Sequence, residues 1–580
     1  MGNVMLFTVL ALVLGPAAAG ANSDPDGPPV APVRNVVDEY HGTKVPDPYR
    51  YFENLSEPEV QAWFRGQADY ARRQLDAIPG RKKLLERIAE LDTGAPYRIR
   101  VIRRWPDGSL HYLKRMAGEN LDKLYYRHAA SGQERLLVDP EAKGRADGLP
   151  EGVHYSIEFA VPSPDRTYVA YGLAAAGSED TTLRVLHASA GEDLPVRISR
   201  IEVAYNEPSW LPDSKAFVYS RRRDLPAGTA ATEKWKLTAA HLHRLSTNPD
   251  EDPIVFGKAA AEPVPMADTD FPSVFVPPDS DHAVGKIKHG DATELTLYAA
   301  PAASLAPDAL AKGEPVVWKK VCDVEHEVKD FAVRGGDVYL LSARDAGRYK
   351  VVRTSLGKPD FARADVVVPQ GKAVIESVAA AKDALYVGLL EGPLDQVLRL
   401  KYETGAPARA VELPAGEPSG QVVDTSPDCD GALIGTASWT RAGRLYAYDP
   451  KSGKLTDTGL RPQGKFDNPQ GIESVEVMVT SHDGVRVPLS IVYKSGLKRD
   501  GTNPTLVQGY GAYGFTTSAN FNPVNLAWLE RGGVLAFAHV RGGGTFGKEW
   551  HLAGQKATKP NTWTDFIACC EYLVREGYTS

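Results

Sequence analysis

Two stretches decide how the C-terminal part of the chain folds: Thr505–Tyr513, which reads TLVQGYGAY, and Val534–Gly544, which reads VLAFAHVRGGG. Each begins with a short apolar run that has the length of a buried strand. Each ends in glycines, which let the backbone turn sharply or come close to another group. We therefore predict two buried strands, each followed by a loop in which the backbone is closely approached.

A helix is predicted after the second loop. Four apolar residues recur there at the i, i+3, i+4 and i+7 spacing of one helix face: Phe566, Cys569, Cys570 and Leu573. Asn561 or Thr562 can cap its start, and Gly577 is placed to end it. Strand, loop, strand, loop and helix in this order are typical of a parallel sheet flanked by helices.

Several short motifs of this region form a set. They are Gly509-Tyr510-Gly511-Ala512-Tyr513, Gly532-Gly533-Val534, Arg541-Gly542-Gly543-Gly544, Asp565-Phe566 and Glu571-Tyr572-Leu573. Together they resemble the first half of the hydrolase domain of the prolyl oligopeptidase family of serine peptidases. In that family a Gly-x-Ser-x-Gly nucleophile elbow follows, with the acid and histidine later still. The 580 residues contain no such motif, so we expect a chain truncated before its catalytic serine and inactive by itself.

The resemblance assigns two tyrosines to the active site. Tyr510 takes the position whose phenol donates to the oxyanion, and Tyr513 takes a substrate-pocket position that is usually Phe in the family. We read Arg541 and its three glycines as structural, because they shape the backbone beside the site. We expect His539 and His551 to be packing or surface residues, since the family's catalytic histidine comes later in the chain.

The middle of the chain predicts a seven-bladed β-propeller. Short alternating strands are broken by Pro-Asp or Gly-Asp turns, and the seven turn aspartates lie 45 to 66 residues apart, near the length of a four-stranded blade: Asp107, Asp165, Asp213, Asp279, Asp337, Asp383 and Asp428. These aspartates are expected to close turns rather than to bind calcium or act in catalysis. An array of β-sandwiches is the rival architecture, but it would not need seven similar units between two halves of another domain.

The chain on either side of the propeller resembles the two parts of one hydrolase domain. Tyr40-His41-Gly42 and Asp47-Pro48-Tyr49-Arg50 resemble the family's N-terminal signature, which packs onto the hydrolase domain, and helical periodicity follows it. His482-Asp483-Gly484 lies between two alternating runs and predicts a β-hairpin. The expected division is a signal peptide at 1–21, an N-terminal segment at 22–93, the propeller at 94–465 and an incomplete α/β-hydrolase domain at 466–580.

Composition excludes several classes of protein. An apolar fraction of 43%, a charged fraction of 24% and a net charge of −7 are those of an ordinary soluble globular chain and argue against nucleic acid or a membrane as partner. Val4–Leu14 followed by Ala17–Ala21 predicts an export signal, hence a periplasmic or secreted protein. The four cysteines form no disulfide framework or metal motif, and Cys569 and Cys570 are expected to be small buried residues.

Three functions remain open at this point. The first is an endopeptidase that hydrolyses short peptides after proline, acts as a monomer and needs no cofactor or metal. The second, also implied by the resemblance, is a peptidase of the same family that cleaves after basic residues. The third is a propeller that binds peptides without catalysis and keeps only a remnant of the hydrolase domain.

Overall fold

The computed structural model describes residues 27–226, 228–403 and 405–580, so the predicted signal peptide at 1–21 lies outside the described residues. The chain divides into two compact units, one ending at Glu90 and one spanning Leu91–Ser580, and each is described by itself. None of the helices in the described ranges is long and apolar enough to cross a bilayer. Those ranges also hold no group of three or more His, Cys, Asp or Glu side chains that could bind a metal ion.

The N-terminal unit is a hairpin followed by helices. Its elements are β1 (Val36–Tyr40), β2 (Thr43–Asp47), α1 (Pro58–Asp76) and most of α2 (Arg81–Asp92). Arg50 ties the signature to the hairpin, because its guanidinium binds Asp38 and lies 2.8 Å, Nε to Oδ2, from Asp47. The predicted helices are confirmed, whereas packing of this segment onto the hydrolase domain stays a prediction.

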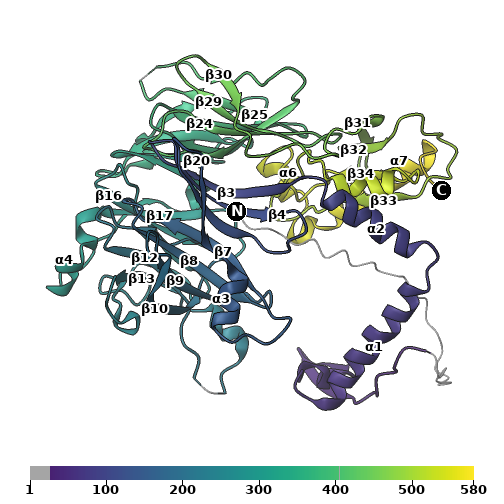
Figure 1. Cartoon of the computed structure of the whole chain (residues 1–580), viewed down its shortest axis with the longest axis horizontal. Coiled ribbons are helices and arrows are strands. Elements are labelled where there is room, and N and C mark those ends of the chain that lie inside the picture. Colours follow the sequence, from purple (N-terminus) through teal and green to yellow (C-terminus); the bar gives the residue numbers. More distant parts are fainter. Residues whose placement is uncertain (1–26, 227, 404) are drawn as a thin grey trace. The chain divides into compact units, whose positions relative to one another are not determined.

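The second unit begins with sheets of antiparallel strands (Figure 1). The strands up to the middle of the propeller are β3 (Tyr97–Arg104), β4 (Leu110–Met116), β5 (Lys123–Arg127), β6 (Glu134–Val138), β7 (Tyr155–Pro162), β8 (Tyr168–Ala175), β9 (Thr181–His187), β10 (Glu192–Ile201), β11 (Ser209–Trp210), β12 (Ala216–Arg221), β13 (Ala239–Arg244) and β14 (Ile254–Phe256). Two short helices, α3 (Pro140–Ala146) and α4 (Pro307–Ala311), lie in connections between strands.

The remaining propeller strands form four more sheets. They are β15 (Phe271–Phe275), β16 (His282–Lys288), β17 (Leu295–Pro301), β18 (Lys319–Cys322), β19 (Val328–Arg334), β20 (Asp337–Ser342), β21 (Lys350–Ser355), β22 (Asp365–Val368), β23 (Val374–Ala380), β24 (Leu385–Glu391), β25 (Leu394–Leu400), β26 (Arg409–Ala410), β27 (Ser419–Asp424), β28 (Leu433–Ala437), β29 (Leu445–Asp449) and β30 (Lys454–Asp457).

These strands group in fours, with one fusion. Each of β3–β6, β15–β18, β19–β22, β23–β26 and β27–β30 is a four-stranded sheet. Strands β7–β14 form one eight-stranded sheet, because β10 and β12 pair at Ile201 and Arg221. Seven blades therefore stay a prediction, since the fused sheet can be read as one unit or two.

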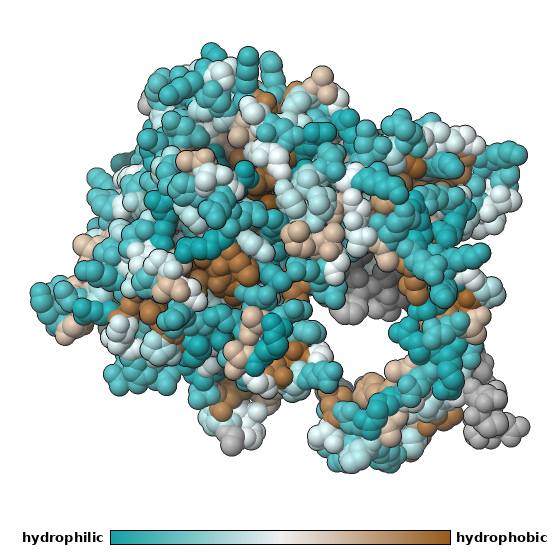
Figure 2. Space-filling model, viewed as in Figure 1, coloured by the Kyte–Doolittle hydropathy of each residue, from teal (hydrophilic) through white to brown (hydrophobic). Residues whose placement is uncertain are grey.

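Contacts between the first and last sheets bring the ends of the propeller together. Arg104 of β3 forms an ion pair with Asp424 of β27, with 2.9 Å between Nε and Oδ2, and the Cys429 thiol contacts the Arg104 carbonyl. Apolar side chains of neighbouring sheets pack into shared clusters; Phe256, for example, packs with Tyr298 and Trp318. Hydrophilic side chains cover most of the visible face, with apolar patches between them (Figure 2).

Some of the turn aspartates connect neighbouring sheets. Asp279 accepts hydrogen bonds from Arg334 Nη1 at 2.6 Å and from the Gly335 amide at 2.9 Å, both in the next sheet. Asp383 accepts from the Gly431 amide at 2.6 Å across another junction. The expectation that these residues only close turns was therefore incomplete. A sequence pattern that identifies a turn does not reveal which partner reaches it from the next sheet.

The C-terminal part is a four-stranded sheet with helices. Its elements are β31 (Ile472–Thr480), β32 (Arg486–Lys494), β33 (Thr505–Gln508), β34 (Val534–Ala538), α5 (Leu526–Leu529), α6 (Lys548–Leu552) and α7 (Pro560–Arg575). The sheet order is β31-β32-β34-β33, in which β33 and β34 are parallel and the other neighbours antiparallel. The predicted hairpin and both strands are confirmed.

Helix α7 begins earlier than the sequence analysis expected. Pro560 is its first residue and Lys559 its N-cap, in place of Asn561 or Thr562. The physical reason is that proline's fixed φ suits the first turn of a helix, where its missing N–H costs nothing. Gly577 follows the helix with φ +72°, as predicted. Cys569 and Leu573 are buried against β32 and β34, whereas Cys570 is only partly buried.

The sheet contacts the propeller at two places within the second unit. Trp439 stacks on Phe537 of β34, with 4.4 Å between ring centroids, and its indole N–H donates to Glu476 at 3.0 Å. Lys548, at the start of α6, places its Nζ 3.0 Å from Glu294 Oε1 and 2.8 Å from Glu327 Oε1. These contacts hold the loops that follow β33 and β34 beside the propeller sheets.

Candidate active site

The loop after β33 can only be built with glycines. A Cβ on Gly509 would lie 2.7 Å from the Phe566 ring. A Cβ on Gly511 would lie 2.3 Å from Thr562 Cγ2 and 2.9 Å from the Arg541 carbonyl, and Gly511 also has φ +62°. Contacts below 3.0 Å and a left-handed backbone both exclude a side chain here. Tyr510 thus lies between two positions that have no room for any residue other than glycine.

Tyr510 projects from this fixed loop. Its side chain is 43% exposed, and within the described ranges its hydroxyl makes no hydrogen bond. Its ring meets Phe515 edge-on at 5.7 Å and lies 6.4 Å from the ring of Tyr513. An exposed phenol on a rigid backbone is free to donate its proton to an oxygen of a bound ligand.

Tyr513 lies in the same loop under backbone strain. It has φ +54°, which is uncommon for a residue with a large side chain, and it is 57% exposed. The structure therefore brings the two tyrosines assigned from the sequence together on one surface. Their proposed roles as oxyanion donor and pocket wall stay predictions.

The glycine loop after β34 packs backbone to backbone against the Tyr510 loop. The Gly514 amide donates to the Gly542 carbonyl at 3.1 Å. A Cβ on Gly542 would lie 2.0 Å from the Gly511 carbonyl oxygen, and one on Gly544 would lie 2.3 Å from that of Gly514. The Arg-Gly-Gly-Gly motif is therefore structural, as its interpretation from the sequence had it.

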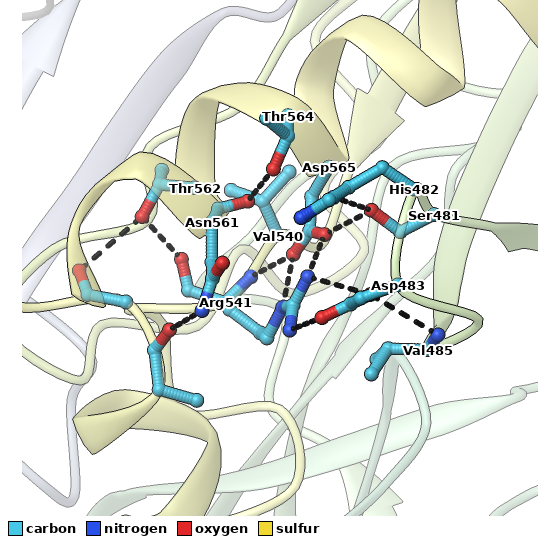
Figure 3. Close-up of polar contacts among 12 residues, drawn as sticks. Ser481, His482, Asp483, Val485, Val540, Arg541, Asn561, Thr562, Thr564 and Asp565 are labelled. Atoms are coloured by element: carbon cyan, nitrogen blue, oxygen red, sulfur yellow. Dashed lines mark hydrogen bonds and ion pairs between the residues drawn. The ribbon is translucent and has the colours of Figure 1, made fainter.

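A buried ionic network anchors this second loop (Figure 3). Asp565 of α7 is fully buried and accepts from Arg541 at Nε, at Nη2 and at the backbone N–H, at 2.9, 2.6 and 3.0 Å. Ser481 donates to the same carboxylate at 2.6 Å. On the other side of the guanidinium, Asp483 accepts at 2.5 Å from Nη1.

The network shifts the pKa values of Arg541 and Asp483 in the directions that favour their charged forms. Its hydrogen bond with Asp565 raises the pKa of Arg541 above its ordinary value. The hydrogen bond from Arg541 lowers the pKa of Asp483, whose carboxylate is partly exposed. Because a buried charge is tolerated only when it is paired and hydrogen-bonded, the arginine and both aspartates act as one unit.

Sequence reasoning missed this network. Asp565 was recognised only as part of a motif and Asp483 only as part of a hairpin turn, and Ser481 was not singled out. One signal could have found it, because Asp565 lies one turn before Cys569 and two turns before Leu573 on the buried face of α7, where a lone carboxylate needs a cation. Arg541, between two buried stretches, was the available partner.

The two histidines near the motifs differ in environment. His539 is 4% exposed, and burial lowers its pKa to about 4. Its Nε2 lies 2.7 Å from Ser490 Oγ, which in turn donates to Glu476 at 2.6 Å. Because Ser490 is fully buried, this Ser-His-Glu cluster cannot reach a substrate and serves packing, as predicted for His539.

His551 lies at a cavity instead. Its Nδ1 is 2.8 Å from the Gly542 carbonyl, so Nδ1 carries the proton. The cavity, of about 250 Å³, has Tyr513, Gly514 and His551 on the hydrolase side and Lys288, Lys329, Tyr349 and Glu376 on the propeller side. Residues of the propeller and of the hydrolase part therefore meet at this cavity beside Tyr513.

Comparison with known proteins identifies the family. The sequence model described as the prolyl oligopeptidase N-terminal β-propeller domain matches residues 28–458, and the one described as the prolyl oligopeptidase family matches residues 519–580. The chain belongs to the prolyl oligopeptidase family. Its propeller and hydrolase parts are those of a serine peptidase of this family, which confirms the resemblance drawn from the sequence.

Relatives within the family match most of the chain. A prolyl endopeptidase of Elizabethkingia meningoseptica is 27% identical over 555 residues, which are 94% of this chain and 72% of the relative. Dipeptidyl aminopeptidase BI of Pseudoxanthomonas mexicana is 25% identical, and the match spans 99% of this chain and 77% of the relative. A solved structure from a study of two prolyl endopeptidases has a TM-score of 0.82 at 29% identity, over 95% of this chain and 77% of that chain.

Proposed function

We propose that this chain carries the propeller and part of the active site of a serine endopeptidase that cleaves short peptides on the C-terminal side of proline. The observation that carries the proposal is the exposed Tyr510 phenol on its glycine-fixed loop, in a chain of this family. Specificity for proline is supported by the name of the prolyl endopeptidase relative. The exposed rings of Tyr510, Tyr513 and Phe515 also offer apolar faces for a prolyl ring.

In this proposal the chemistry is divided between residues. Attack on a peptide carbonyl needs an activated hydroxyl, a histidine base, a carboxylate and donors for the developing oxyanion. Tyr510 supplies one donor, because a phenol is neutral at pH 7 and points from a rigid loop. Tyr513 forms a wall of the pocket for the residue before the scissile bond. The Arg541–Asp565 network keeps the Tyr510 loop in place by holding the adjacent glycine loop.

We further propose that this chain lacks the catalytic serine, its acid and its base and is inactive by itself, because no Gly-x-Ser-x-Gly motif occurs in it. The propeller screens out folded proteins and the enzyme acts as an exported monomer. The intact mass of the protein isolated from its natural source tests two of these points, the absence of the triad and the export that would remove residues 1–21. A mass well above that of the printed chain without residues 1–21 supports the proposal. A mass equal to the mature printed chain, together with rapid cleavage of proline peptides by it, would refute it.

Cleavage after basic residues has one observation in its favour, the carboxylate of Glu376 at the cavity beside Tyr513. Matched fluorogenic peptides with Pro or Arg before the scissile bond separate the two specificities, using the complete natural protein. We expect the Pro peptide to be preferred.

Tyr510→Phe should then lower kcat by about 10²–10³ with little change in KM, since the lost donor acts on the transition state. An unchanged kcat would remove Tyr510 from the active site.

A further inference from the structure

One wall of the cavity beside Tyr513 carries a lysine whose charge has no carboxylate partner. Lys288 is the last residue of β16 and is partly buried. Its ammonium donates to the Ala292 carbonyl and lies 5.6 Å from the centroid of the Tyr205 ring. Throughout the part of the chain that the structure describes, no Asp or Glu oxygen lies within 4 Å of it.

Two neighbouring lysines are paired with carboxylates, and a third lies on another cavity. Lys329, on the same cavity, lies 3.7 Å from Glu376 Oε2, and its ammonium also faces the Tyr349 ring. Lys548 is bound by two glutamates of the propeller. Lys286, two residues before Lys288, donates to the Tyr205 carbonyl at 2.9 Å and lines a different cavity. Of the two lysines that line this cavity in the described residues, Lys288 is therefore the one without a carboxylate within 4 Å.

The environment of Lys288 favours an anionic ligand. Lys288 is partly removed from water, and this burial lowers its pKa, while Asp291 and Glu294 act in the opposite direction from a distance. A partly desolvated ammonium gains most from a charged acceptor at hydrogen-bond distance. Tyr513 lines the same cavity, so a molecule that places an anionic group at Lys288 can also contact the loop that carries Tyr513.

We propose that Lys288 binds a carboxylate of the peptide substrate, and so acts as a specificity-determining residue. This rests on the proposed peptidase function. The carboxylate is either the free C-terminus of a short peptide or the side chain of an acidic residue a few positions from the scissile bond. Both give the same charge-assisted hydrogen bond with the ammonium.

The test compares peptides that differ only in these carboxylates. One Pro-containing peptide is made with a free C-terminus or an amide, and with Glu or Gln after the scissile bond. Cleavage is measured with the complete natural protein. With the wild type we expect a KM about tenfold lower for the peptide that carries the recognised carboxylate, at similar kcat, because uniform binding changes KM alone.

Variants assign the effect to the residue. Lys288→Met should abolish the tenfold preference and leave the neutral peptide unaffected, whereas Lys288→Arg should keep most of the preference. Lys312→Met is the matched control, because Lys312 is an exposed propeller lysine with no carboxylate within 4 Å in the described ranges. A preference that survives in Lys288→Met, or a wild type that does not distinguish the peptides, overturns the proposal.

Direct binding separates this proposal from the proposed function. The same peptides, with a fluorophore at the N-terminus and a reduced, uncleavable bond after the proline, are titrated against the complete protein. Carboxylate-dependent binding that Lys288→Met removes supports the site even if proline peptides are not cleaved. Cleavage after proline with no carboxylate dependence in binding or KM supports the peptidase and overturns the lysine site. If only the C-terminal amide loses the preference, the recognised carboxylate is the C-terminus. If only the Gln peptide loses it, the recognised carboxylate is the acidic side chain.

Discussion

Within their sheets, the propeller and the β31–β34 region differ in how far apart in the sequence the paired strands lie. In the propeller, each four-stranded sheet is made of consecutive antiparallel strands, so most pairings are local. In the β31–β34 sheet, β33 pairs in parallel with β34 across a long connection, and Ser481 meets Asp565 over 84 residues of chain. One pairing between consecutive strands can be weakened without affecting the others. The site, in contrast, depends on a few contacts between residues that lie far apart in the chain. Substitutions should therefore have larger effects around Arg541 than in the propeller.

The largest effect is expected from Asp565→Ala. It leaves the buried Arg541 guanidinium with only Asp483, and it also removes the acceptor of Ser481 and of the Arg541 amide. Breaking a buried ion pair from one side costs about 3–5 kcal/mol. Urea unfolding followed by fluorescence measures the loss.

Asp483→Ala is the control for this prediction. Its carboxylate is about one-third exposed, so its ion pair with Arg541 contributes only about 1 kcal/mol or less. Equal losses in the two variants would contradict the view that Asp565 is the anchor of the glycine loop.

A smaller loss of stability with a larger loss of activity is expected from Gly511→Ala. The new Cβ would lie 2.3 Å from Thr562, and the alanine would have to adopt φ +62°. The loop must therefore shift, and Tyr510 shifts with it. Gly532→Ala is the matched control, because it has φ +79° and no atom within 4 Å. We expect about 2–4 kcal/mol for the first and about 1 kcal/mol for the second. Peptide cleavage by the complete protein should fall only in the first.

The sequence predicted local features better than distant ones. Turn residues and alternation revealed the hairpin at Asp483 and the propeller strands, because both depend on neighbours in the chain. Glycines marked the Tyr510 and Arg541 loops, although nothing in the sequence said that Gly511 and Gly542 touch each other. Tyr510 and Tyr513 came from the family resemblance, and the structure adds that they share an exposed surface.

What the sequence could not supply is pairing between distant polar groups. The place of Asp565 on the apolar face of α7 indicates that it needs a cation, but the geometry in which Arg541 reaches it appears only once α7 packs on the sheet. The same holds for Asp279, which looks like any other turn aspartate before Arg334 of the next sheet is placed beside it. The fusion of β10 with β12 also depends on a single pair of residues, which no periodicity reveals.

The propeller offers a test of how much one such link contributes. Asp279→Ala should cost about 1–2 kcal/mol, because Arg334 and the Gly335 amide lose a partly buried acceptor. Asp213→Ala is the control, since Asp213 is exposed and accepts only from the Lys215 amide of its own turn. Its expected cost is about 0.5 kcal/mol. If Asp279→Ala costs no more than Asp213→Ala, the link between the sheets contributes no more to stability than a surface contact does.

The smallest expected effect is on the pH dependence of stability near the sheet. Burial holds the pKa of His539 at about 4 in the folded chain, against an ordinary value near 6.5. Between these values the unfolded chain binds the proton and the folded chain does not, so stability is lost as pH falls below 6.5. From pH 7 to 5.5 the loss is about 1 kcal/mol. His539→Gln removes this contribution, so its free energy of unfolding should depend less steeply on pH than the wild type's.

Glu476 faces His539 through Ser490 and must be separated from it. Burial raises the pKa of Glu476, so its contribution has the opposite sign: it favours the folded chain at low pH and is lost as pH rises. Glu476→Gln should therefore make the loss of stability on acidification steeper, where His539→Gln makes it shallower. Urea unfolding at pH 5.5, 6.25 and 7 measures both slopes. Equal slopes in the wild type and His539→Gln would mean that the imidazole binds its proton equally well in the folded and unfolded chains, so that the sheet does not keep it neutral.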